Sequence, residues 1–116
     1  MKPDTVLIVD DEPALGLFAA ELLADAGIKS ETTERGRDAL DRLERNPARY
    51  QAVLLDRRMP DIDGLSVLRQ IKSARETRDI PVVLLTGLSS EADIVAGIDA
   101  GAYYYATKPC PQPMLV

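Results

Sequence analysis

The chain has 116 residues, about the length of one domain with a single hydrophobic core. Hydrophobic residues make up 46% of it and charged residues 28%, which is ordinary for a folded protein and excludes a disordered or fibrous chain. Nineteen acidic residues against fourteen basic ones give a net charge of −5, and no run of lysine and arginine occurs, so we do not expect this chain itself to bind nucleic acid.

The numbers of cysteine and histidine residues exclude further kinds of site. Cys110 is the one cysteine and histidine is absent, which excludes an internal disulfide and a zinc site built from cysteine and histidine within this sequence. No apolar run approaches the roughly 18 residues of a membrane span, and Met1 leads to the first predicted strand without a signal-peptide pattern. We therefore expect a cytoplasmic protein with no membrane contact.

Five segments predict β-strands. TVLIVD (5–10), VLLD (53–56) and PVVLLT (81–86) are apolar runs too short for helices, which is typical of strands buried on both faces. IKSETT (28–33) predicts a weaker strand, and AYYYAT (102–107) an aromatic one.

Segments with helical periodicity lie between these strands. The first helix is expected to begin near Pro13 and to stop at Gly27, and the last predicted helix to stop at Gly101. Apolar residues at helical spacing mark four helices, with stripes of Leu15, Phe18, Leu22 and Ala26, of Ala39, Leu40 and Leu43, of Leu65, Leu68 and Ile71, and of Ile94 and Ile98.

The alternation of strands and helices predicts a doubly wound α/β fold, with a five-stranded parallel sheet covered by helices on both faces. We expect the flavodoxin-like strand order 2-1-3-4-5. Only seven residues follow Lys108-Pro109, and Pro111 and Pro113 interrupt them, so the final helix is expected to be missing or truncated. Residues 1–116 are thus interpreted as one domain and as a fragment of a longer protein.

Polar residues collect at the carboxyl ends of the predicted strands, where open α/β sheets bind ligands. Asp10 and Asp11 end the first strand, Asp56 the third and Thr86 the fourth, and Lys108 follows the fifth. Carboxylates from adjacent strands repel one another unless a cation neutralises them, and an all-oxygen ligand set suits Mg²⁺, which often completes its shell with phosphate oxygen. The pattern therefore predicts a magnesium and phosphate site.

Four motifs, VLIVDDEP, VLLDRRMPDIDGL, PVVLLTG and YATKP, occur in the order and at the intervals of a known family. With them the sequence resembles the CheY-like receiver domain of two-component response regulators over nearly its whole length. The resemblance implies that Asp56 is the phosphoacceptor and that Mg²⁺ is the cofactor. It also implies roles for further residues: Asp10, Asp11, Asp56 and the backbone carbonyl of Arg58 as metal ligands, Thr86 and Lys108 as phosphoryl-binding groups, Tyr105 as an aromatic switch, and Glu12 as a neighbour of the metal ligands.

The resemblance also implies how such a domain works. Asp56 would take a phosphoryl group from a phosphohistidine on a partner histidine kinase or phosphotransfer protein. Inward movement of Thr86 and rotation of Tyr105 would then change the surface of helix four and strand five, which controls an output domain or partner, or a homodimer through a face that includes helix five. The domain would not be a metabolic enzyme, although it catalyses its own aspartate phosphorylation and dephosphorylation.

Other interpretations remain. A receiver-like module that works through protein contacts without phosphorylation is the main alternative, although the presence of all the site residues argues against it. DIDG (61–64) is similar to a phosphatase nucleophile motif but does not directly follow a strand, so Asp61 and Asp63 are interpreted as turn or cap residues. Phosphate-binding loops of nucleotide enzymes are absent. The Arg58 side chain would pair with Glu12, cover the phosphate or remain solvated, and Cys110 is interpreted as a packing residue.

Overall fold

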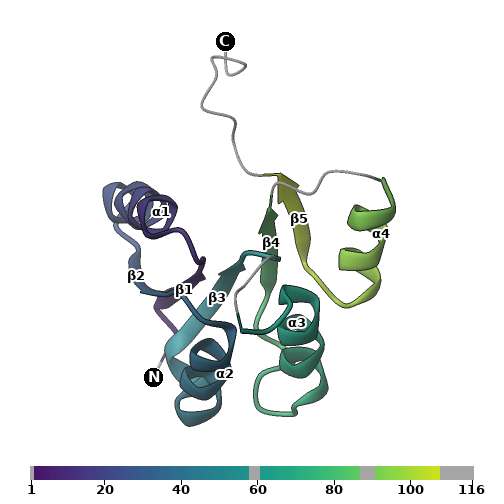
Figure 1. The fold of residues 1–116 in the computed structure, drawn as a ribbon. Helices are drawn as coiled ribbons and strands as arrows, with labels where there is room; N and C mark the ends of the chain where they lie inside the picture. The colour runs from purple at the N-terminus through teal and green to yellow at the C-terminus, as the bar shows by residue number, and fades with distance from the viewer. Residues whose placement is uncertain (1, 58–60, 87–90, 108–116) are drawn as a thin grey trace.

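The computed structural model describes residues 2–57, 61–86 and 91–107, which form an α/β fold with the predicted alternation (Figure 1). Within these ranges, no helix is long and apolar enough to cross a lipid bilayer. In chain order the elements are β1 (Thr5–Val9), α1 (Pro13–Asp25), β2 (Lys29–Thr33), α2 (Gly36–Arg45), the 3₁₀ turn η1 (Pro47–Arg49), β3 (Tyr50–Leu55), α3 (Gly64–Ser73), β4 (Val82–Thr86), α4 (Glu91–Asp99) and β5 (Tyr104–Thr107).

The five strands form one sheet in the order β2-β1-β3-β4-β5, and every neighbouring pair is parallel. This confirms the predicted fold class and strand order. Strand order reverses at β1, because β2 lies on one side of it and β3 and all later strands lie on the other. In open parallel sheets, ligands bind at such a reversal, beyond the carboxyl ends of the strands.

The main core lies between the sheet and α2, α3 and α4. Alternate strand residues point into it, among them Leu7, Val53 and Leu84, and each of these is fully buried. From α3, Leu68 is equally buried, while Ala96 of α4 packs against the edge of the same cluster. The strands are therefore hydrophobic on this face because three helices cover it.

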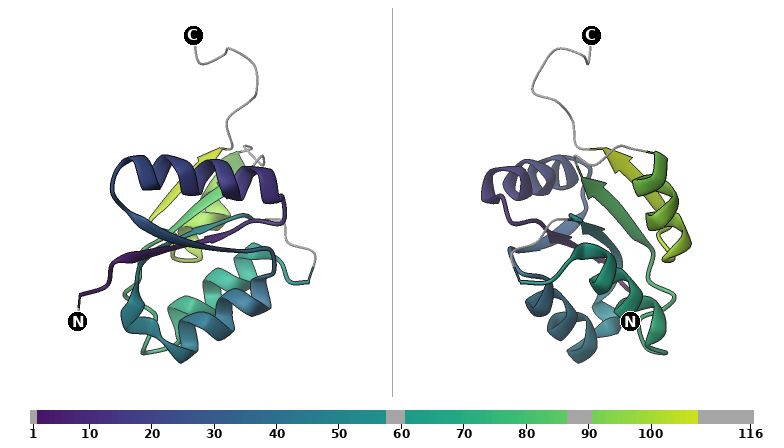
Figure 2. Two further views of the ribbon diagram at one scale, coloured as in Figure 1. Left: turned by 90° about the vertical axis from the view of Figure 1, so that its left-hand side faces the viewer. Right: turned by 45° about the vertical axis from the view of Figure 1, so that its right-hand side comes forward.

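The opposite face of the sheet is covered less completely. Figure 2 shows α1 on the side of the sheet opposite to α2 and α3, and α1 is the one described helix on that side. Its residues Phe18 and Leu22 remain 52% and 55% exposed, although they belong to the predicted apolar stripe. Helices thus lie on both faces, as predicted, but α1 alone leaves apolar surface uncovered among the described residues.

Two glycines end helices as the sequence predicts. Gly27 follows α1 with φ of 78°, and Gly101 follows α4 with φ of 109°, a backbone region that other residues rarely adopt. The turn at Gly101 extends into the residues that follow it. β5 therefore begins at Tyr104, two residues later than predicted from AYYYAT.

β3 begins three residues earlier than the predicted VLLD segment, at Tyr50. Tyr50 pairs with Thr5 of β1, and its ring is buried. Its hydroxyl donates to the Glu31 carboxylate at 2.7 Å, and Glu31 also pairs with Arg49 at 2.6 Å. A buried, hydrogen-bonded tyrosine extends the strand, which the apolar pattern alone did not indicate.

We expect Leu68→Ala to destabilise the protein strongly, because it leaves a cavity in the main core. Such truncations cost about 2–5 kcal/mol of unfolding free energy. Leu17→Ala is the matched control: Leu17 of α1 is 63% exposed, and surface substitutions change stability by about 0.5 kcal/mol or less. Urea denaturation of the wild type and both variants checks this, and equal losses would contradict the described core.

Tyr50 gives the fold an alkaline pH dependence. Burial is the largest cause and the hydrogen bond to the Glu31 carboxylate the second, and together they raise the pKa of Tyr50 from 10.0 to about 12. Because the folded pKa is raised, its contribution to stability is complete below pH 10 and is lost as the pH rises through about 12. Urea denaturation between these pH values should show that the free energy of unfolding of the wild type falls as the pH rises. The fall should be smaller in Tyr50→Phe. Identical pH profiles would contradict this account.

Candidate functional site

The candidate site lies at the edge of the sheet where the parallel strands end. Asp10 and Asp11 directly follow β1, and Asp56 directly follows β3, the neighbouring strand. The register pairs Val9 with Leu55, the last residues of these two strands. The backbone pairing therefore brings Asp10 and Asp56 side by side.

Hydrogen bonds continue this alignment one residue beyond the strands. The backbone N–H of Asp10 donates to the carbonyl of Thr33 at 3.0 Å, and that of Asp56 donates to the carbonyl of Val9 at 2.8 Å. The Asp10 carboxylate accepts the backbone N–H of Glu12 at 2.9 Å. This last bond links Asp10 to the turn that leads into α1, so the start of the first helix orients the carboxylate.

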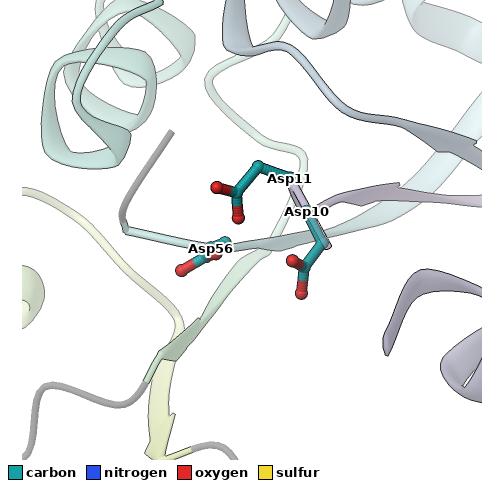
Figure 3. Close-up of side chains that lie close together, drawn as sticks. All are labelled: Asp10, Asp11 and Asp56. Atoms are coloured by element: carbon teal, nitrogen blue, oxygen red, sulfur yellow. The ribbon is translucent and has the colours of Figure 1, made fainter. Parts of the chain in front are cut away.

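The three carboxylates form an acidic cluster, defined here as Asp10, Asp11 and Asp56. One carboxylate oxygen from each lies within 4.8 Å of the others, and Figure 3 shows the side chains gathered where β1 and β3 end. Asp10 and Asp56 are 8% and 4% exposed, while Asp11 is exposed to solvent. The cluster thus has a buried base and an open side, through which a ligand can reach Asp56.

The donor set of the acidic cluster fits a hard divalent cation. All three side chains offer oxygen, which Mg²⁺ and Ca²⁺ prefer over the nitrogen and sulfur ligands of zinc and copper sites. Mg²⁺ characteristically takes only one or two carboxylates and keeps several waters, which suits a cluster that is open on one side. The predicted metal site is therefore chemically consistent with these side chains.

Several predicted site residues fall outside the described part of the chain. Arg58 and Lys108 lie outside the residues that the structure describes, and so do the side chains of Thr86 and Tyr105. Their backbones are described: Thr86 is the last residue of β4, the strand next to β3, and Tyr105 pairs with Leu84 of β4.

Glu12, the remaining candidate, occupies the N-cap position of α1 beside the acidic cluster. Its side chain is exposed and makes no cap hydrogen bond to the helix. It contributes to the cluster through its backbone N–H, which binds Asp10. This hydrogen bond shows that the Glu12 backbone supports Asp10, and the predicted role of Glu12 as a neighbour of the metal ligands stays a prediction.

Gly64 allows the start of α3 to pack closely against the backbone of Asp56 and Arg57. Its N–H donates to the carbonyl of Arg57 at 2.7 Å, and a Cβ atom on Gly64 would lie 2.5 Å from the backbone carbonyl oxygen of Asp56. No other residue has room there, so glycine is required for α3 to begin directly against the residue that follows β3. The sequence indicated a turn at this position but not the close approach to Asp56.

The comparisons with known proteins agree with this arrangement. The family model described as the response regulator receiver domain matches residues 6–116. Response regulator MprA of Mycolicibacterium vanbaalenii is 40% identical over 107 residues, which are 92% of this chain and 45% of that protein. The chain thus spans about half the length of this curated relative.

Solved structures show the same fold. The phosphorylated cyanobacterial phytochrome response regulator RcpA superimposes with a TM-score of 0.86 at 30% identity, over 94% of this chain and 83% of that one. The N-terminal domain of a response regulator receiver protein from Methanoculleus marisnigri JR1 has a TM-score of 0.81 at 32% identity, over 96% and 89% of the two chains. Fold, acidic cluster and sequence similarity together place this chain in the family of response regulator receiver domains.

Proposed function

We propose that the chain is a phosphoacceptor in two-component signal transduction, and that Asp56 takes a phosphoryl group from a phosphohistidine on a histidine kinase or phosphotransfer protein. The observation that carries the proposal is the buried Asp56 carboxylate within the acidic cluster, at the strand-order reversal of a parallel sheet. These 116 residues contain no histidine, which is in keeping with a phosphohistidine donor outside them.

In the proposed reaction, a carboxylate oxygen of Asp56 attacks the phosphorus atom and forms the O–P bond of an aspartyl phosphate. The N–P bond to the partner's histidine breaks, and that nitrogen keeps the electron pair. Burial at the base of the cluster holds the attacking carboxylate in one orientation, which contributes to rate because phosphoryl transfer depends mainly on positioning and electrostatics.

A bound Mg²⁺ would supply positive charge against the charge of the transferring phosphoryl group. Asp11 and Asp56 would hold it together with the backbone carbonyl of Arg58, and Asp10 would hold it largely through water. The hydrogen bond from the Glu12 N–H to the Asp10 carboxylate supports this assignment. We propose Thr86 and Lys108 as the groups that bind phosphoryl oxygens, in keeping with the position of β4 next to β3 and of β5 next to β4.

The proposed output is a change in the surface formed by α4 and β5. Val95 and Ile98 of α4 and Tyr104 of β5 are exposed apolar side chains there, which suits a surface that a partner covers. Phosphorylation would act through Thr86 and Tyr105 on this surface, and through it on an output domain or a second copy of the chain. We place this signalling in the cytoplasm.

We also propose that residues 1–116 are one receiver domain of a longer protein, whose final helix packs on α1. An apolar groove of about 240 Å³ supports this: it lies between α1 and the sheet, and Leu15, Phe18, Leu22 and Leu54 are among its lining residues. A helix there would cover the face that α1 leaves partly open.

The first test is phosphorylation itself. Incubation with acetyl phosphate and Mg²⁺ should add the mass of one phosphoryl group, because Asp56 is the nucleophile, and Asp56→Ala should abolish the adduct. Chelation of Mg²⁺ should prevent the adduct in the wild type. Asp25→Ala, at the far end of α1, is the control that should label normally. Intact-mass measurement of the full-length protein provides the readout, and an unlabelled wild type would favour a phosphorylation-independent interaction module.

The second test concerns the groove. In the full-length protein we expect Phe18→Ala to cost about 3 kcal/mol of unfolding free energy, the lower end for a buried phenylalanine. In the 116-residue chain the loss should be much smaller, because half of the Phe18 side chain is exposed. Leu68→Ala is the control, since it should cost the same in both proteins. Equal effects of Phe18→Ala in the two urea denaturation series would overturn the proposed final helix.

A further inference from the structure

Asp61 binds a helix that is distant from it in the sequence. One carboxylate oxygen of Asp61 accepts the backbone N–H of Gly36 and the other accepts that of Arg37, both at 3.0 Å. These N–H groups belong to the first turn of α2, where N–H groups have no partner inside the helix. The N-cap residue Arg35 provides no side-chain hydrogen bond. Asp61, from the segment between β3 and α3, therefore caps α2 in its place.

The contact around Asp61 is tight. A Cβ atom on Gly36 would lie 2.4 Å from a methyl carbon of Ile62 and 2.8 Å from a methyl carbon of Val67, distances at which atoms have to move apart. Glycine at the start of α2 therefore lets Asp61 and Ile62 approach the helix backbone closely. The two hydrogen bonds and the packing together fix the distance between α2 and the start of α3.

The same segment begins at the acidic cluster. Asp56 directly follows β3, and the N–H of Gly64 at the start of α3 donates to the carbonyl of Arg57. The two ends of the segment are thus joined beside Asp56, and its described middle part is bound to α2 through Asp61. The described parts of this segment are therefore held at two places, at Arg57 beside Asp56 and at Asp61 on α2.

We propose that Asp61 is a positioning residue for the acidic cluster, because it anchors the segment after Asp56 on the first turn of α2. This inference rests on the proposed function, since the cluster has to bind Mg²⁺ for its positioning to matter. Asp61 is not itself a member of the cluster. It acts on the cluster through Gly64, which follows it in the same segment and is hydrogen-bonded to Arg57, the residue after Asp56.

The charge of Asp61 supports this role. Partial burial raises the pKa of Asp61, but the N–H groups of Arg37 and Gly36 outweigh that effect, so that its pKa lies below the ordinary value. The carboxylate is therefore charged at neutral pH, and a negative charge at a helix N-terminus is favourable. Hydrogen bonds to a charged acceptor are also stronger than those between neutral groups.

The neighbouring Asp63 offers a matched control. It lies two residues further along the same segment, at the N-cap position of α3, and its side chain makes no cap hydrogen bond. Asp63→Asn and Asp61→Asn both remove one negative charge at a similar place. A difference between them therefore reports the contact with α2 and not the charge alone.

The experiment compares the full-length wild type with Asp61→Ala, Asp61→Asn and Asp63→Asn. NMR titration with Mg²⁺ alone measures the dissociation constant, and hydrogen exchange of the Gly36 and Arg37 amides measures the α2 contact. Loss of a supporting interaction typically weakens metal binding by about 10-fold or more. We expect a loss of that size in Asp61→Ala, a smaller one in Asp61→Asn, and faster exchange of both amides. Asp63→Asn should resemble the wild type.

Each outcome has a definite meaning. A folded Asp61→Ala variant that binds Mg²⁺ as the wild type does, while the two amides exchange faster, would show that Asp61 only caps α2 and would overturn the inference. If Asp61→Ala does not fold, the comparison of Asp61→Asn with Asp63→Asn decides in the same way. A wild type that binds no Mg²⁺ would overturn the proposed function, and the role of Asp61 with it.

Discussion

The structure depends on the register between β1 and β3, which brings three aspartate side chains close together. Because β1 and β3 are parallel neighbours and end together, Asp10 and Asp56 lie side by side, and Asp11 joins them from the following turn. At an effective dielectric constant of about 20, two unit charges this close repel with on the order of 3 kcal/mol. A fold that places carboxylates there has to offset that repulsion, either through the rest of its packing or through a bound cation.

The two faces of the sheet are packed differently. The fully buried residues, such as Leu7 and Val53, lie between the sheet and α2, α3 and α4, and they hold the strand ends in place from one face. The opposite face has α1 and its apolar groove. The acidic cluster lies at the edge of the sheet, where Asp10 and Asp56 are buried and Asp11 is exposed to solvent. A nucleophile needs that combination, because it has to be oriented and still be reached by a partner.

The sequence predicted the fold well because its signals are local. Apolar runs, helical stripes and glycine stops identify the elements, and their alternation leaves few possible topologies. The three carboxylates of the cluster were predictable for the same reason, since each directly follows a strand. Tyr50 and Asp61 were not, because each acts through a partner far away in the chain: Tyr50 through Glu31, and Asp61 through Gly36. Asp61 was expected to cap a local turn, and the one sequence signal for its actual contact is an α2 start that lacks a capping side chain.

The β1–β3 register and the contact of Asp61 with α2 differ in how easily they can change in the folded protein. The register of β1 and β3 belongs to the core and can change only if the core is disrupted, so it determines which carboxylates meet in the cluster. The contact of Asp61 with α2 consists of two hydrogen bonds at a helix end, which can break and form while the sheet stays intact. A cation that binds the cluster favours whichever arrangement of this segment binds it better, and by linkage the segment then changes the affinity for the cation by the same factor. In the proposed role of Asp61, the coupling between the acidic cluster and α2 would pass through these two backbone N–H groups, while the core holds the sheet in place.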